Sequence, residues 1–254
     1  MKSQSSAWKN VFAVFKREFF SYFNSPVAYV IIVSFLVLSQ GLTFTFGNLL
    51  GGDDANLTGP FFSWHPWIYM VLAPAVGMKL WSEEHRLGTL ELLMTMPISP
   101  WQGIVGKFLA AAAIWAIGLA LTFPVIITVF YLGSPDSGPV ISAYLASFLY
   151  AVSCLAVTCA VSAFTRSQVI CFIISVAICF VVTLLGSPLA SDWLGKILPY
   201  SSGWLVHSIT YLSFMTHFYD LSKGVLVLRD LVYFGSIIAV CLMVTAVALQ
   251  SKRS

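Results

Sequence analysis

Histidine and cysteine are the residue types in this sequence that could hold a metal ion or carry out redox chemistry. The five cysteines contain no Cys-x-x-Cys pair and lie in apolar stretches, where a free thiol packs as a small apolar side chain. His207 and His217 stand ten residues apart with no acidic residue between them, whereas a metal site needs several ligands at helical or turn spacing. We therefore predict no metal ligand and no catalytic residue in this chain.

Phosphate binding is a second chemistry for which the sequence offers a candidate. The stretch Gly103-Ile-Val-Gly106-Lys107 ends as a phosphate-binding loop does. That loop also requires a glycine at the position of Trp101 and a serine or threonine at the position of Phe108. The chain itself is therefore expected to bind neither ATP nor any other cofactor.

The longest polar segment between apolar stretches runs from Trp81 to Pro100, and it predicts a short amphipathic helix over residues 82–96. Its start is rich in acidic residues, which the helix dipole favours, and its leucines recur at spacings of three and four. Pro97 and Pro100 end the helix because proline cannot continue it. Such a helix, held between two membrane spans, can insert into a groove of a partner. The alternative is an ordinary solvated loop helix.

Composition determines which elements must position these residues. Hydrophobic residues make up 59% of the 254 residues and charged residues 9%, against about 25% charged in a typical soluble domain. Lipid must therefore cover much of the surface. Six stretches with few or no charges are long enough to cross about 30 Å of hydrocarbon. We predict a single all-α integral membrane domain over residues 1–254, with membrane helices at residues 26–47, 60–81, 105–132, 139–164, 167–190 and 231–251.

Two further segments are predicted to lie against the membrane or to enter it only in part. Residues 8–25 carry Trp8 and several phenylalanines at spacings of three and four, beside Lys16 and Arg17, which is typical of an interfacial helix. Residues 196–224 are apolar but interrupted by serine, threonine and histidine. They predict re-entrant or extracytoplasmic helices between the fifth and sixth spans, where protein or water covers the backbone.

The distribution of basic residues predicts the orientation. With the N-terminus inside and the spans alternating, ten of the 13 Lys and Arg residues fall on the inner side, as the positive-inside rule requires. Both termini are then cytoplasmic. The formal net charge is only +3 and the basic residues form no stripe, which argues against nucleic acid as a partner.

Three motifs, in order along the chain, resemble those of type-2 ABC transporter permeases. The pattern Glu84-x-x-x-Gly88-Thr89-x-Glu91-x-Leu93-x-x-x-Pro97-Ile98-Ser99, with Lys107 eight residues after Ser99, resembles their coupling-helix signature. The pattern Lys16-Arg17-Glu18-Phe19-x-x-Tyr22-Phe23-x-Ser25-Pro26 looks like their elbow helix running into the first span. The segment from Thr216 to Phe234, with His217-Phe218, Gly224 and Arg229-Asp230, is similar to the gliding-motility (GldF-like) and NosY-like permeases.

The resemblance implies a permease subunit of an exporter in the bacterial inner membrane, in a dimer with a second copy or a homologous permease. Two ATP-binding cassette subunits would bind ATP and Mg, and an extra membrane or periplasmic subunit is possible. The implied ATPase-coupling residues are Glu83, Glu84, Arg86, Leu87, Gly88, Thr89, Leu90, Glu91, Leu93 and Pro97. The implied elbow-helix residues are Lys16, Arg17, Glu18 and Pro26. The implied extracytoplasmic gate or partner surface comprises His207, His217, Phe218, Gly224, Arg229 and Asp230.

Several alternatives stay open at this stage. Gly88 would serve either close helix packing or a local bend, and Glu84 and Glu91 would either pair with basic residues of the ATPase or remain solvated. For the whole chain, the alternatives are a membrane scaffold for an extracytoplasmic assembly and an ATP-independent channel or carrier. The scarcity of charges in the predicted spans argues against ion coupling.

Overall fold

The computed structural model describes residues 2–47, 59–88, 99–132, 136–187, 196, 210–224 and 227–251, and these residues are helical, without any strand. The helices are α1 (Lys2–Asn24), α2 (Pro26–Phe46), η1 (Phe62–Trp64), α3 (His65–Gly77), α4 (Lys79–Leu87), α6 (Pro100–Ala120), α7 (Phe123–Leu132), α8 (Ser137–Phe164), α9 (Gln168–Leu184), α12 (Phe214–Ser222) and α13 (Leu228–Ser251).

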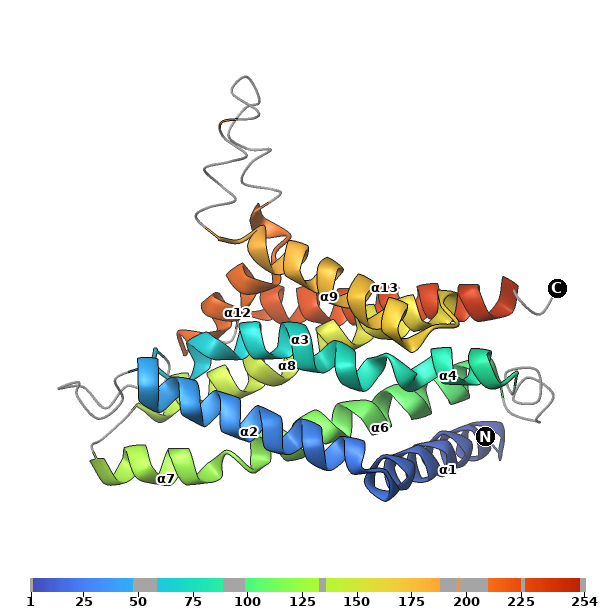
Figure 1. The fold of residues 1–254 in the computed structure, drawn as a ribbon, viewed down its shortest axis with the longest axis horizontal. Helices are drawn as coiled ribbons and strands as arrows, with labels where there is room; N and C mark the ends of the chain where they lie inside the picture. The colour runs from blue at the N-terminus through green and yellow to red at the C-terminus, as the bar shows by residue number, and fades with distance from the viewer. Residues whose placement is uncertain are drawn as a thin grey trace.

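Helix α8 is the central element of the bundle. It packs against α3, α6, α9, α12 and α13, and these helices run roughly along the long axis of the molecule (Figure 1). Small side chains allow the close approach, as is usual between membrane helices. A Cβ added at Gly77 of α3 would lie 2.8 Å from the side chain of Thr158 on α8.

The two ends of the molecule differ in the elements that they carry. Both chain termini and α4 lie at one end, whereas α7 and α12 lie toward the other (Figure 1). We call these the α4 end and the α12 end. The predicted placement of both termini on one side of the membrane requires this arrangement.

In the described part of the chain, four helical segments are long and apolar enough to cross a membrane: Pro26–Phe46, Pro100–Tyr131, Ser137–Phe164 and Leu228–Ser251. The chain is therefore a multi-pass membrane protein. Helix α9 is also apolar but has 17 residues, and α3 has 13. These two helices occupy the predicted second and fifth spans, so the prediction of six spans depends on them.

One predicted span, within the apolar segment Pro100–Tyr131, is interrupted by a short turn at residues 121–122. The sequence analysis predicts one helix over residues 105–132, but α6 begins at Pro100 and ends at Ala120, and α7 starts at Phe123. Pro124 explains the break, because it lacks an N–H and its ring clashes with the carbonyl of the residue four positions earlier. The Thr122 hydroxyl donates to the carbonyl of Leu119 at 2.6 Å and so satisfies one backbone group freed by the break.

The turn from α1 into α2 is set by local sequence. Ser25 is the N-cap of α2, with extended backbone, and its hydroxyl accepts a hydrogen bond from the N–H of Val27. Pro26 follows at the first helical position, where its fixed φ suits a helix start and its missing N–H costs nothing. The prediction of a separate N-terminal helix leading into the first span agrees with this turn.

Helix α1 lies closely against α6, and Gly106 sits at the contact. A Cβ at Gly106 would lie 2.8 Å from the Val14 side chain and 3.1 Å from the Val11 carbonyl oxygen. We expect Gly106→Val to lower the free energy of unfolding by about 1–3 kcal/mol, the usual cost of overpacking. Thermal unfolding in detergent would measure the loss. Gly103→Val on the same helix is the control, because its Cβ meets nothing within 4 Å; equal losses would contradict the close contact.

Candidate functional site

A buried lysine at the α4 end joins three helices. The side chain of Lys107, on α6, is 5% exposed, and its Nζ lies 2.7 Å from Oε1 of Glu84 on α4 and 3.5 Å from Oε2 of Glu18 on α1. The same Nζ donates to the carbonyl oxygen of Leu80 at 3.3 Å. We call Glu18, Glu84 and Lys107 the charge cluster.

The charge cluster is close to electrically balanced. Arg17 lies 2.7 Å from Glu18, which also pairs with Lys107. Two cations, Arg17 and Lys107, therefore face two carboxylates, Glu18 and Glu84. A buried charge is tolerated only when it is paired and hydrogen-bonded, and removal of one partner leaves the other uncompensated. The cluster therefore ties α4 to α1 and α6 as one unit.

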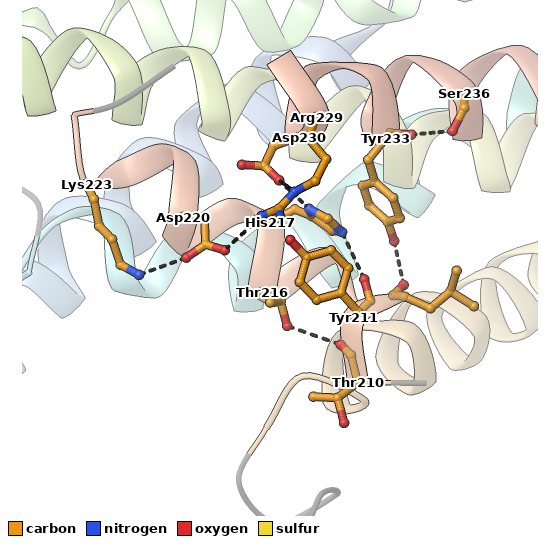
Figure 2. A network of polar contacts seen from close by, with 11 residues as sticks. Thr210, Tyr211, Thr216, His217, Asp220, Lys223, Arg229, Asp230, Tyr233 and Ser236 are labelled. Carbon is orange, nitrogen blue, oxygen red and sulfur yellow. Dashed lines mark hydrogen bonds and ion pairs between the residues drawn. The ribbon is translucent and has the colours of Figure 1, made fainter. Parts of the chain in front are cut away.

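The α12 end carries a second buried polar group, which Figure 2 shows. The Nδ1 of His217 lies 2.7 Å from Oδ1 of Asp230, and its Nε2 lies 2.9 Å from the carbonyl oxygen of Tyr211. The ring is therefore held through both of its nitrogens. Tyr233 stacks on the imidazole with ring centroids 3.8 Å apart. We call these four residues the His217 network; it joins α12 to the start of α13.

The exposed edge of the His217 network is a chain of surface charges. The Nε of Arg229 lies 3.5 Å from Asp230, its NH2 nitrogen lies 3.9 Å from Asp220, and its guanidinium lies over the ring of Tyr211 at 4.7 Å. Lys223 pairs with Asp220 at 2.8 Å, and this hydrogen bond to the carboxylate raises the pKa of the Lys223 ammonium. These contacts are exposed and contribute little stability compared with the buried pair.

Comparison with known families identifies the chain. Residues 55–251 match the family described as ABC-2 family transporter protein. The chain belongs to the ABC-2 transporter family. No curated protein matches it. A member of this family is the membrane-spanning permease subunit of an ABC transporter, and the family implies an ATP-binding cassette subunit as a partner.

Helix α4 in this ABC-2 permease covers only the start of the predicted coupling helix, whose residues 89–96 lie outside the described part of the chain. The sequence analysis predicts a helix over residues 82–96, but α4 runs from Lys79 to Leu87 and stops at Gly88, which has a φ of +69°. A Cβ at Gly88 would meet nothing within 4 Å among the described residues, so this part of the chain offers no packing contact for the glycine. Its left-handed backbone, which glycine adopts without strain, makes the bend that ends the helix.

The described coupling residues divide into two sets. Leu87 is 62% exposed and Arg86 is also exposed, at the end of α4. Glu84 faces Lys107 within the chain, which differs from the expected pairing with a partner or with solvent. The remaining predicted coupling residues lie outside the described part of the chain: Thr89, Leu90, Glu91, Leu93 and Pro97.

The predicted elbow residues lie at the α1–α2 junction of the permease. Lys16 and Arg17 are exposed on α1, Glu18 belongs to the charge cluster, and Pro26 begins α2. Sequence reasoning did not identify Lys107 as a site residue. The signal that could have found it is a single basic residue in an otherwise apolar helix, which must find a buried partner.

The predicted extracytoplasmic surface is only partly a surface. His217, Phe218 and Asp230 are buried, so in this conformation they hold α12 and α13 together and cannot contact a partner. Arg229 is exposed. Gly224 has a φ of +96° after α12, next to Pro139. His207 lies outside the described residues.

No metal centre emerges from the described residues. Among them, no group of three or more His, Cys, Asp or Glu side chains is placed to hold a metal ion. Cys154, Cys159, Cys171 and Cys179 are free and buried, and Cys241 is free and partly buried. His65 packs among aromatic rings and its Nδ1 lies 2.6 Å from the hydroxyl of Ser147.

Proposed function

We propose that this permease couples ATP hydrolysis by a separate subunit to movement of a substrate, or to transmission of force, across the inner membrane. Two ATP-binding cassette subunits would bind ATP and Mg and would contact α4. A second copy of the chain, or a homologous permease, would complete the transporter. Export is the proposed direction, and gliding-motility and NosY-like permeases are the proposed nearest functional relatives.

The charge cluster is the observation that carries the proposal. Helix α4 holds the described part of the predicted coupling segment, and its Glu84 binds Lys107 of α6, which also binds Glu18 of α1. A displacement of α4 by an ATPase would therefore also move α6 and α1. Short, buried ion pairs transmit such a displacement because breaking them costs several kcal/mol.

The proposed orientation places the α4 end in the cytoplasm. Both termini lie at that end together with α4 (Figure 1), in agreement with the distribution of basic residues. Six spans would then be α2, α3 with the first residues of α4, α6 with α7, α8, α9 and α13. The α12 end, held by the His217 network, would act as the extracytoplasmic gate or as the docking surface for an additional subunit.

The exposed end of α4 supplies the test of ATPase coupling. We expect Leu87→Asp to abolish co-purification of an ATPase that carries a phosphate-binding loop, and to abolish stimulation of its activity by the permease. The chain should remain folded, because the Leu87 side chain is 62% exposed. Leu212→Asp is the matched control: this leucine is 61% exposed but lies beside α12, near the other end of the molecule.

Two results would contradict ATPase coupling. The first is a Leu87→Asp variant that still binds and stimulates the ATPase as the Leu212→Asp control does. The second is recovery of the chain alone, with transport activity in liposomes that needs no ATP, which would support a channel or carrier. Recovery with extracytoplasmic proteins but without any ATPase would support the membrane scaffold.

A further inference from the structure

A polar cavity lies beside the charge cluster. Its volume is about 300 Å³, and α1, the start of α2, α4 and α6 line it. The lining residues that bear charge are Glu18, Lys79, Glu83, Glu84 and Lys107. Ser21, Tyr22 and Ser25 add hydroxyl groups. Nothing in ATPase coupling requires such a cavity.

Part of this lining has no partner among the described residues. Lys107 is committed to Glu18, Glu84 and a backbone carbonyl. Lys79 and Glu83, by contrast, make no ion pair among the described residues. The Oε2 atom of Glu84 is buried and has no hydrogen-bond partner there either. A buried acceptor without a donor is costly, so the cavity favours a ligand that brings N–H or O–H groups.

The charges of the lining select the kind of ligand. Three carboxylates face two ammonium groups, so a purely anionic ligand is disfavoured. One free cation, Lys79, nevertheless remains to attract an anion. Burial raises the pKa of the Tyr22 phenol, and nearby Glu18 raises it further, so this hydroxyl stays neutral. The lining therefore suits a ligand that carries a positive and a negative group a short distance apart.

The position of the cavity indicates where such a ligand would come from. The cavity lies where amphipathic α1 meets α2, which is long and apolar enough to cross the membrane. Trp8 and Phe12 of α1 are 72% and 64% exposed, as expected for a helix whose aromatic side chains enter the interface. Phospholipid headgroups lie at this depth, and their concentration there is high.

We propose that the cavity binds the headgroup of a zwitterionic phospholipid with a primary ammonium group, as in an ethanolamine lipid. The ammonium would donate to the Glu83 carboxylate and to Oε2 of Glu84, and the phosphate would lie against Lys79 and the serine hydroxyls. A choline headgroup has no N–H, so it leaves Oε2 of Glu84 without a donor. This inference stands independently of ATPase coupling.

Native mass spectrometry of the purified full-length chain, with added ethanolamine, choline and glycerol phospholipids of identical acyl chains, tests the proposal. We expect the ethanolamine lipid to bind about tenfold more tightly than the choline lipid, the loss expected for a hydrogen bond to a charged group. We expect Glu83→Gln to remove this preference and Lys79→Gln to weaken binding of all three lipids. Arg166→Gln, an exposed cation that does not line the cavity, should change neither.

Three results would overturn the proposal. Equal binding of ethanolamine and choline lipids would show that no N–H donor is recognised, and this comparison needs only the wild-type chain. Preference for the glycerol lipid would assign the cavity to an anion. If a folded Glu83→Gln variant kept the preference for the ethanolamine lipid, the cavity would not be the site that recognises the headgroup.

Discussion

Replacing Lys107 with methionine is expected to lower the free energy of unfolding by about 3–5 kcal/mol, the usual cost of removing one partner of a buried ion pair. Methionine retains the length and apolar packing of the lysine stem but not its charge. Glu84 and Glu18 would then face each other across the site without the cation that binds both. Thermal or denaturant unfolding in detergent measures the loss, and ATPase stimulation in the assembled transporter should fall with it.

A double-mutant cycle separates the ion pair from simple loss of packing. Glu84→Gln should be destabilising alone, because it leaves Lys107 with only the more distant Glu18 carboxylate, at 3.5 Å. The double variant Glu84→Gln/Lys107→Met should be more stable than the sum of the single losses predicts, since no uncompensated charge remains between them. Strictly additive losses would show that the pair contributes no coupling between α4 and α6.

The long helices were predictable because charged residues mark the ends of each apolar run. The predicted spans at residues 26–47, 139–164 and 231–251 correspond to α2 (Pro26–Phe46), α8 (Ser137–Phe164) and α13 (Leu228–Ser251). A charge at mid-membrane costs far more than any apolar residue returns, so runs without charge mark spans.

Two local departures from the predicted helix limits have identifiable physical causes. The break between α6 and α7 follows from Pro124, a local signal that a count of apolar residues does not weigh. The early end of α4 follows from the left-handed Gly88, which can be read from sequence only as a bend or as a close contact. Sequence alone cannot distinguish these two roles, because the distinction depends on what lies opposite the missing Cβ.

The pairings within both sites depend on tertiary structure. Glu18, Glu84 and Lys107 come from three helices, and no periodicity connects them. His217 and Asp230 were both identified from their motif but were assigned to a surface, although the structure buries them against each other. A histidine and an aspartate in one motif are therefore a reason to expect an internal pair before a docking surface.

Replacing Asp230 with alanine is expected to release α12 from α13. Asp230 is fully buried and its Oδ1 accepts from His217 at 2.7 Å, so the variant leaves His217 Nδ1 without an acceptor. We expect a loss of about 3–5 kcal/mol, as for other buried pairs that lose one partner. Hydrogen exchange should show faster exchange in residues 214–222 and 228–234, while α8 stays protected.

Asp220→Ala is the matched control for Asp230→Ala, because it removes a carboxylate from the same group of charges at a partly exposed position. The Asp220 side chain is 32% exposed, and its partners Lys223 and Arg229 are 69% and 59% exposed. Exposed pairs of this kind contribute about 0–1 kcal/mol. A much larger loss of stability for Asp230→Ala than for Asp220→Ala would show that the buried His217–Asp230 pair holds α12 against α13. Similar, small losses would instead mean that apolar packing holds the two helices together, through the buried side chains of Phe214 and Phe218 on α12.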